Sequence, residues 1–258
     1  MQIVVTIAEV LEPITNLDGA AFMRAWTDIA KCHYALWTRG VRHWDPSISN
    51  LMVNKQRDGA YTGVLSDWDL DPVEGSGVPE RTGTLPFMAQ DLLRHVGDME
   101  RLYRHDLESL VWTLPWAILR YQSGKLVDNP PIAHWVTDRT CYDCGAHKVV
   151  FLDGLDTAFE GIETWSEEVA IAIYMLLDLD LASAARRDRL LKAIPDFRLR
   201  QRNPACWRRM SASLELSAQE VYEGFWETLR GLAEKYEELL YVIGLLPRDS
   251  IPSSLVVC

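Results

Sequence analysis

Three oxygen-bearing side chains stand in an order that suits phosphoryl transfer. Asp45 and Asn50 are separated by four residues, and Asp67 follows later in the chain. Phosphoryl transfer needs a carboxylate that orients the attacking hydroxyl, and oxygen ligands for the Mg²⁺ ion that neutralises the phosphates. The sequence therefore predicts that Asp45 orients the hydroxyl, while Asn50 and Asp67 hold the metal.

The elements predicted around these residues would bring them to one end of a hairpin. Residues 51–53 and 61–65 have the composition of two short strands, and a turn at Asp58-Gly59 joins them. Antiparallel pairing would place the residues before the first strand beside those after the second. In the same loops, His43 is expected to be a buried hydrogen-bonding residue and Trp68 to pack in the core.

Helices dominate the rest of the prediction. Apolar residues at helical spacing predict a helix over 20–39, which Asp18 caps and Gly40 ends. Further helices are predicted over 88–95, 105–121, 165–182, 184–194 and 217–243, the last of which starts with a Ser217–Glu220 capping box. Residues 2–7 are predicted to form a buried strand and residues 70–84 a loop. The predicted fold class is therefore mainly α with a small β-hairpin.

The composition limits the partners of this 258-residue chain. A formal net charge of −11 argues against a nucleic-acid binder, and no apolar run is long enough to cross a membrane. Five cysteines in a chain of this length do not form a disulfide framework, and the N-terminus lacks the pattern of a secretory signal. We therefore expect an intracellular protein with no nucleic-acid and no membrane partner.

Two cysteines later in the chain have metal-ligand spacing. Cys141 and Cys144 are spaced as in a zinc knuckle, with His147 close by. A second ligand pair is missing, so we expect two reduced cysteines in a turn. The residues that follow, 148–153, are expected to form a short strand or a loop.

The chemical pattern is accompanied by further motifs in a fixed order. His43-x-Asp45-x-x-x-x-Asn50 matches a protein-kinase catalytic loop in length and residue order. The accompanying motifs are at Leu11–Ile14, Cys32–Trp37, Arg81–Thr84 and His105–Ser109. With them the chain resembles the fungal-type protein kinase domain family, closely over about residues 1–160. The resemblance implies a protein-kinase-like C-terminal lobe that lacks most of the N-terminal lobe.

The resemblance implies that the chain has three parts, and it also implies two ligands and further site residues. Residues 1–15 would be the last small-lobe strand and the hinge, 16–246 the C-terminal lobe and 247–258 a tail. ATP and Mg²⁺ would be the ligands, and Asp106 would anchor the main chain of the catalytic loop. The residues implied for the adenine site are Glu9, Val10, Leu11 and Met52.

Several departures from the family pattern bear on activity. Trp44 replaces the catalytic-loop arginine, Ser47 a lysine that steadies the γ-phosphate, and Asp69 the glycine of the metal-binding motif. Gln90-Asp91 stands where Pro-Glu is usual. No Gly-rich loop and no strand lysine precede the matched motifs. We therefore expect negligible phosphotransfer by this chain alone, and a protein partner that covers the exposed small-lobe side.

Several functions are open at this point. The first is a phosphotransferase of the protein-kinase type, and the second is a non-catalytic pseudokinase scaffold. The third is a small-molecule phosphotransferase similar to aminoglycoside or choline kinases, which carry a motif like Ser66–Asp69 after the same loop pattern. The Arg81–Thr84 motif favours the protein-kinase type. The plainest alternative is that Asp45, Asn50 and Asp67 are loop residues that only cap helices and shape turns.

Overall fold

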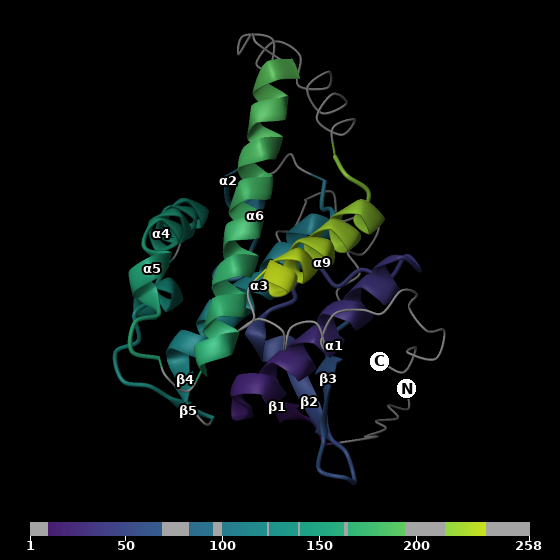
Figure 1. The fold of residues 1–258 in the computed structure, drawn as a ribbon, viewed down its shortest axis with the longest axis vertical. Helices are drawn as coiled ribbons and strands as arrows, with labels where there is room; N and C mark the ends of the chain where they lie inside the picture. Colours follow the sequence, from purple (N-terminus) through teal and green to yellow (C-terminus); the bar gives the residue numbers. More distant parts are fainter. Residues whose placement is uncertain are drawn as a thin grey trace, which may run out of the picture.

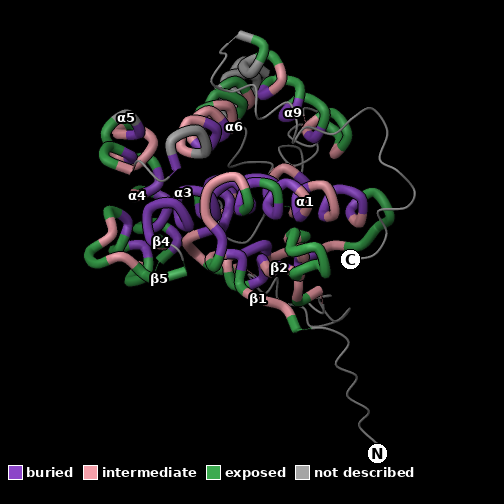
Figure 2. Tube along the Cα trace, turned by 60° about the horizontal axis from the view of Figure 1, so that its bottom comes forward, coloured by how far each residue is buried: buried purple, intermediate pink, exposed green. Residues whose placement is uncertain are grey.

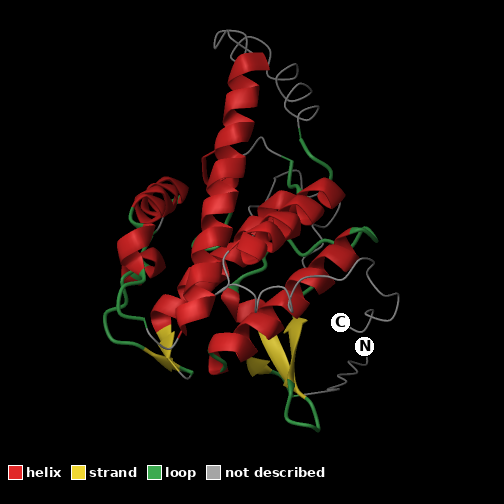
Figure 3. Ribbon diagram, in the orientation of Figure 1, coloured by secondary structure: helices red, strands yellow, loops and turns green. Residues whose placement is uncertain are grey.

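The computed structural model describes residues 10–68, 83–94, 100–122, 124–138, 140–162, 165–193 and 215–235. The predicted strand over 2–7, residues 70–82 of the predicted loop and the predicted tail lie outside these ranges. The described part is mainly helical with two small antiparallel sheets (Figure 3). This confirms the mainly α fold class.

The elements follow one another along the chain as Figure 1 labels them. The strands are β1 (Glu12–Pro13), β2 (Leu51–Lys55), β3 (Tyr61–Leu65), β4 (Tyr121–Gln122) and β5 (Lys125–Leu126). The α-helices are α1 (Gly19–Trp37), α2 (Gln90–Arg94), α3 (Tyr103–Arg120), α4 (Cys141–Asp153), α5 (Leu155–Ala158), α6 (Ser166–Ala193) and α9 (Ala218–Lys235). Short 3-10 helices lie at Ile14–Asn16, Ile48–Asn50 and Ala133–Val136.

The larger sheet has the strand order β1-β2-β3 and lies against α1. Leu51 pairs with Leu65, and the turn at Asp58-Gly59 closes the predicted hairpin with Gly59 at a φ of 87°. A Cβ atom on Gly63 would lie only 1.9 Å from Ala25 O of α1. Gly63 therefore permits the close approach of β3 and α1 that fixes the hairpin on the helical core.

Helix α1 forms where the apolar spacing predicts it. Its buried face includes Phe22, Trp26 and Ile29, and these side chains join the main core cluster. Gly40 follows the helix with a φ of 88°, which only glycine adopts without strain. Asp18 occupies the N-cap position, but its side chain makes no capping hydrogen bond to the helix. The helix therefore depends on burial of its apolar face more than on its cap.

Helix α3 lies at the centre of the helical part. All of its residues except Arg104 are buried (Figure 2). It packs against α1, α6 and α9, and Trp26 Nε1 of α1 donates a hydrogen bond to Leu110 O at 3.1 Å. Among the described helices, none is long and apolar enough to span a bilayer.

Two predictions about the helices are wrong. Residues 141–153 form α4 rather than a turn followed by a strand or loop, because Thr140 Oγ1 caps the helix by accepting from Asp143 N at 3.1 Å. The predicted break between helices at 182–184 does not exist, and α6 runs unbroken through it. The Ser217–Glu220 capping box of α9 is confirmed, with Ser217 N bonded to Glu220 Oε2 at 2.8 Å.

Candidate functional site

One end of the β2–β3 hairpin collects the residues predicted for phosphoryl transfer. Ser66 follows β3, and both its N–H and its hydroxyl donate to Asn50 O, at 2.9 and 3.1 Å. The hairpin register thus places Ser66 opposite Asn50, and Asp67 is the next residue along the chain. The side chain of Asp67 is exposed, and that of Asn50 is buried. We call Asp45, Asn50, Asp67 and Thr84 the hairpin site.

Asp45 is the residue that joins the parts of the hairpin site. Its main-chain oxygen accepts from Asn50 Nδ2 at 2.9 Å. Its carboxylate accepts twice from Thr84, at 2.8 Å from the N–H and at 3.0 Å from the hydroxyl. The sequence prediction did not include this contact, although Thr84 ends the Arg81–Thr84 motif. The loop before β2, the end of β3 and the segment at Thr84 therefore meet at one place.

His43 makes hydrogen bonds to two segments of this site. Its side chain is fully buried, and its Nε2 lies 2.7 Å from Ser66 O, so this nitrogen must carry the proton. Its Nδ1 accepts from Asp45 N at 3.2 Å. Burial lowers the pKa of His43, which agrees with a neutral ring between a donor and an acceptor. Trp68 packs against the core and donates from Nε1 to Leu65 O.

Asp106 lies fully buried beneath the same loop. Its Oδ2 accepts from Trp44 N at 3.3 Å and lies 3.1 Å from His33 Nε2. Arg101 reaches the other oxygen, with Nε 4.0 Å from Asp106 Oδ1, and its guanidinium lies 5.6 Å from the ring centre of Trp44. Burial lowers the pKa of Arg101, while Asp106 and Asp45 raise it. The main chain of the loop at Trp44 is thus held by the buried carboxylate of Asp106, which Arg101 and His33 also contact.

Two residues of these loops adopt a backbone conformation that is uncommon outside glycine. Trp44 has a φ of 69° and Asp67 a φ of 64°. Residues in this region persist where surrounding contacts hold them, and such residues concentrate at functional sites. At Trp44 the holding contact is the hydrogen bond to Asp106, and at Asp67 it is the pairing of the preceding Ser66 with Asn50.

The donor set of the hairpin site fits Mg²⁺. Amide and carboxylate oxygens are hard ligands, and Mg²⁺ usually completes its octahedron with water and substrate phosphates rather than with a full protein cage. Across the described ranges, no group of three or more His, Cys, Asp or Glu side chains could hold a metal by itself. Asn50 and Asp67 offer two oxygen ligands that could hold Mg²⁺ together with a phosphate.

Comparison with known proteins bears on this geometry. Residues 3–118 match the family model described as fungal protein kinase. This segment, which is less than half of the chain, is similar to the fungal protein kinase family. No curated protein and no solved structure matches the chain. The matched segment contains all four residues of the hairpin site, the His43 loop and Asp106.

The residues implied for adenine binding lie in two parts of the matched segment, near its start and on β2. Glu9 is outside the described residues, Val10 is 85% exposed and Leu11 is half-buried. Met52 is half-buried and stands opposite Pro13 of β1 in the sheet register. The short strand β1 was not predicted, and it places the chain after Leu11 directly beside Met52.

Ser47 has a structural role that its sequence position does not indicate. It is fully buried, and its hydroxyl lies 2.9 Å from that of Ser49. Its N–H donates to Asp45 O at 2.8 Å. Where the resemblance places a phosphate-binding lysine, this chain therefore has a buried hydroxyl that shapes the loop.

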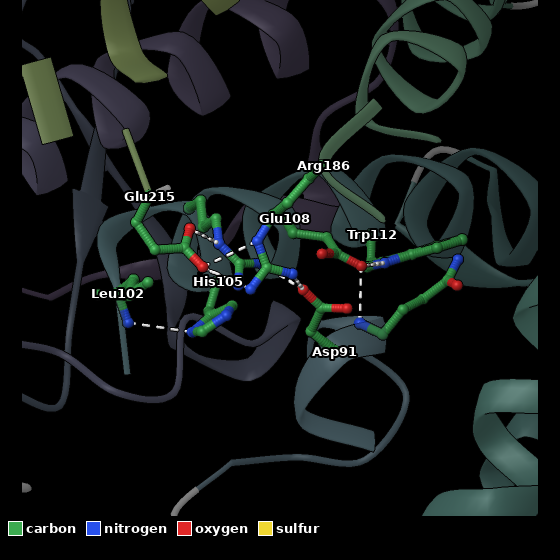
Figure 4. A network of polar contacts seen from close by, with 9 residues as sticks. Asp91, Leu102, His105, Glu108, Trp112, Arg186 and Glu215 are labelled. Carbon is green, nitrogen blue, oxygen red and sulfur yellow. Dashed lines mark hydrogen bonds and ion pairs between the residues drawn. The ribbon is translucent and has the colours of Figure 1, made fainter. Parts of the chain in front are cut away.

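A second polar group lies at the departure from the Pro-Glu pattern. Asp91 Oδ2 of α2 pairs with Arg104 at 2.8 Å and with Arg186 at 2.5 Å, and both arginines also pair with Glu215 (Figure 4). We call Asp91, Arg104, Arg186 and Glu215 the ionic cluster. Their side chains are between 8% and 16% exposed. The cluster joins α2, α3, α6 and the start of α9, and the sequence did not predict it.

A buried lysine of α4 contacts the segment just before α2. Lys148 of α4 is fully buried, donates to Met88 O at 2.6 Å and lies 4.4 Å from the ring centre of Trp112. Burial lowers its pKa to about 8, against the opposing effect of Cys144 and Glu108. Burial also raises the pKa of Glu108, which accepts from Gln90 N at 2.8 Å. These contacts fasten the segment before α2 to the helical core.

The two cysteines of α4 pack against this segment. Cys141 and Cys144 are buried and form no disulfide, and Cys144 Sγ donates to Leu85 O at 3.1 Å. Burial raises the pKa of Cys144. His147 instead lies 2.9 Å from Asp138 Oδ2. Cys144 and His147 therefore have separate partners.

Proposed function

We propose that the hairpin site is the phosphotransfer site of a protein-kinase-like enzyme. The observation that carries this proposal is the pair of contacts at Asp45. Its main-chain oxygen holds the amide nitrogen of Asn50, and its carboxylate is held by Thr84. Because the amide nitrogen of Asn50 is used, the amide oxygen is left to bind a cation beside a fixed carboxylate.

Each residue has a defined task in this proposal. Asp45 orients the attacking hydroxyl and takes up its proton, and Asn50 and Asp67 hold Mg²⁺. When bound, Mg²⁺ supplies positive charge that neutralises the transferred phosphoryl group. The adenine of ATP would lie over Met52 and meet the main chain of Glu9, Val10 and Leu11.

The contact of Thr84 with Asp45 favours a hydroxyl on a protein as the acceptor. Thr84 belongs to the motif that resembles the end of an activation segment, which small-molecule phosphotransferases similar to aminoglycoside kinases lack. A segment fixed to the orienting carboxylate by two hydrogen bonds is placed to align a peptide beside it. We therefore place the acceptor among Ser and Thr side chains.

A second candidate function is a non-catalytic scaffold, and the burial of Ser47 favours it. A single preorganised donor to the reacting group is often worth about 3 kcal/mol, or about two orders of magnitude in rate. The buried hydroxyl of Ser47 cannot replace a lysine at the γ-phosphate. We therefore expect phosphotransfer by this chain alone to be very slow, even where Mg²⁺ and ATP bind.

Binding of Mg²⁺ with ATP tests the proposal directly. The thermal midpoint of the purified chain is measured with ATP, with and without Mg²⁺. We expect a Mg²⁺-dependent rise, because a ligand at about 100 times its Kd stabilises the folded state by about 2.7 kcal/mol. Asp67→Asn should abolish the rise. Asp153→Asn, the same change on the exposed end of α4, is the control and should preserve it.

Turnover separates the two candidate functions. Transfer of labelled phosphate from ATP to a generic protein substrate such as casein is measured in the same samples. Slow transfer that Asp45→Asn abolishes supports the enzyme. Mg²⁺-dependent ATP binding without transfer supports a nucleotide-binding scaffold. An equal thermal rise in wild type and Asp67→Asn would overturn the metal role of Asp67.

A further inference from the structure

A cavity of about 270 Å³ in the helical part is lined by residues of α3, α6, α9 and the segment just before α9. It shares no residue with the hairpin site. Its walls are mostly apolar, with side chains from all three helices, and its size is near the low end of small-molecule pockets, which begin at about 300 Å³. Apolar lining residues include Leu107, Leu179, Leu216, Val221 and Phe225.

Most charged groups on the cavity wall already have partners. Arg104 and Arg186 are held by Asp91 and Glu215 in the ionic cluster. Glu220 accepts from Ser217 N in the capping box. Neither arginine is therefore available to attract an anionic ligand, because both positive charges are already matched by carboxylates.

Asp178 of α6 differs from these groups. It lines the cavity and is half-buried, and within the described ranges no lysine or arginine forms an ion pair with it. Burial raises the pKa of Asp178, and a hydrogen bond from Thr228 of α9 acts in the opposite direction. A carboxylate that is partly removed from water without a cation gains from any positive charge brought to it.

We propose that this cavity binds a small organic cation, with an apolar alkyl or aryl body against the helices and a protonated amine at Asp178. The body removes apolar wall surface from water, which favours binding in proportion to the area covered. The ammonium group donates charge-assisted hydrogen bonds to a carboxylate in a poorly solvated place, where such bonds are strong. An anion of the same shape would meet an unmatched negative charge.

The charge requirement is tested with three probes that share one body. Binding of 4-phenylbutylamine, 4-phenylbutan-1-ol and 4-phenylbutyrate to the full chain is measured by isothermal titration calorimetry. We expect the amine to bind at least about tenfold more tightly than the alcohol, and the acid to bind most weakly. Asp178→Asn should reduce the amine affinity to that of the alcohol. Asp180→Asn, the same change on α6 outside the cavity wall, should leave it unchanged.

The location is tested with two glycines of α9. Gly224 lines the cavity, and a Cβ atom there meets no atom within 4 Å. Gly231 is equally open but does not line the cavity. Gly224→Leu should fill the space and abolish binding of amine and alcohol, whereas Gly231→Leu should not. Both changes favour the helical state, so folding should be retained.

Three results would overturn the proposal. The first is equal affinity for the amine and the alcohol in the wild-type chain. The second is an equal effect of Asp178→Asn and Asp180→Asn on amine binding. The third is unchanged binding in Gly224→Leu, which would place the probe outside this cavity.

Discussion

The hairpin site and the ionic cluster are two places where the described part of the chain gathers polar side chains, and they are built in opposite ways. At the hairpin site, main-chain groups make most of the contacts: Ser66 with Asn50, Asn50 with Asp45, and the N–H of Thr84 with the Asp45 carboxylate. In the ionic cluster, side chains from distant elements bond to one another and are largely buried.

Under the proposed function, the hairpin site binds the ligand, whereas the ionic cluster supports the fold. The exposed side chain of Asp67 can exchange water for a ligand, because contacts of the preceding Ser66 with Asn50 fix the backbone that carries it. The ionic cluster has little access to water and holds α2 against α3 and α6. Removing a charge should therefore cost function at the first place and stability at the second.

The largest expected contrast comes from the same substitution in both regions. Asp91→Asn leaves two mostly buried guanidinium groups short of a counter-charge, so we expect it to lower the free energy of unfolding by about 3 kcal/mol. Asp67→Asn changes an exposed residue, and asparagine tolerates its positive φ, so the change should be below about 0.5 kcal/mol. Urea unfolding measures both. Equal losses would show that the cluster does not support the fold as described.

Lys148 should also make the free energy of unfolding depend on pH. Its folded-state pKa of about 8 lies below the usual 10.5, so between these values the unfolded chain holds a proton that the folded chain has released. Unfolding then takes up protons, and raising the pH stabilises the folded state. Relative to Lys148→Met, the wild-type free energy of unfolding should rise by about 2 kcal/mol between pH 8 and pH 10.

Comparison with a second lysine isolates this effect. Lys55→Met, at the exposed end of β2, should keep the wild-type pH dependence. Tyrosine titration at high pH is common to all three proteins and cancels in the differences. A constant difference between wild type and Lys148→Met from pH 8 to pH 10 would contradict the burial of a charged lysine at Met88.

The smallest expected effect is at Thr84. Thr84→Val removes the hydroxyl that donates to Asp45 Oδ2 but keeps the N–H bond, so overall stability should fall by less than about 1 kcal/mol. Hydrogen exchange of the Thr84 amide should become faster, because one of its two anchors is lost. Thr62→Val, on the exposed face of β3, is the control and should leave that exchange unchanged. Unchanged exchange in Thr84→Val would mean that other contacts hold this segment.

Local signals predicted the parts of the fold that depend on neighbouring residues. The apolar face of α1, the hairpin with its turn at Asp58-Gly59 and the capping box at Ser217 each need only a few adjacent residues, and all three are present. Helix α4 was missed because its two cysteines and the β-branched residues after Lys148 suggested other structures. Thr140 caps its N-terminus, and the helix also packs against α2, a contact that no local pattern reveals.

By itself, the sequence determined that residues 3–118 are similar to the fungal protein kinase family, and it determined the order of Asp45, Asn50 and Asp67 along the chain. Only the tertiary structure decided what surrounds them. Asp91 pairs with Arg186, which is 95 residues away in the chain, and Arg104 pairs with Glu215, which is 111 residues away. The residues next to them in the sequence do not indicate either pair. The physical reason is range: caps, turns and helical faces are set by contacts within a few residues, whereas ion pairs and cavities form when distant elements are packed together.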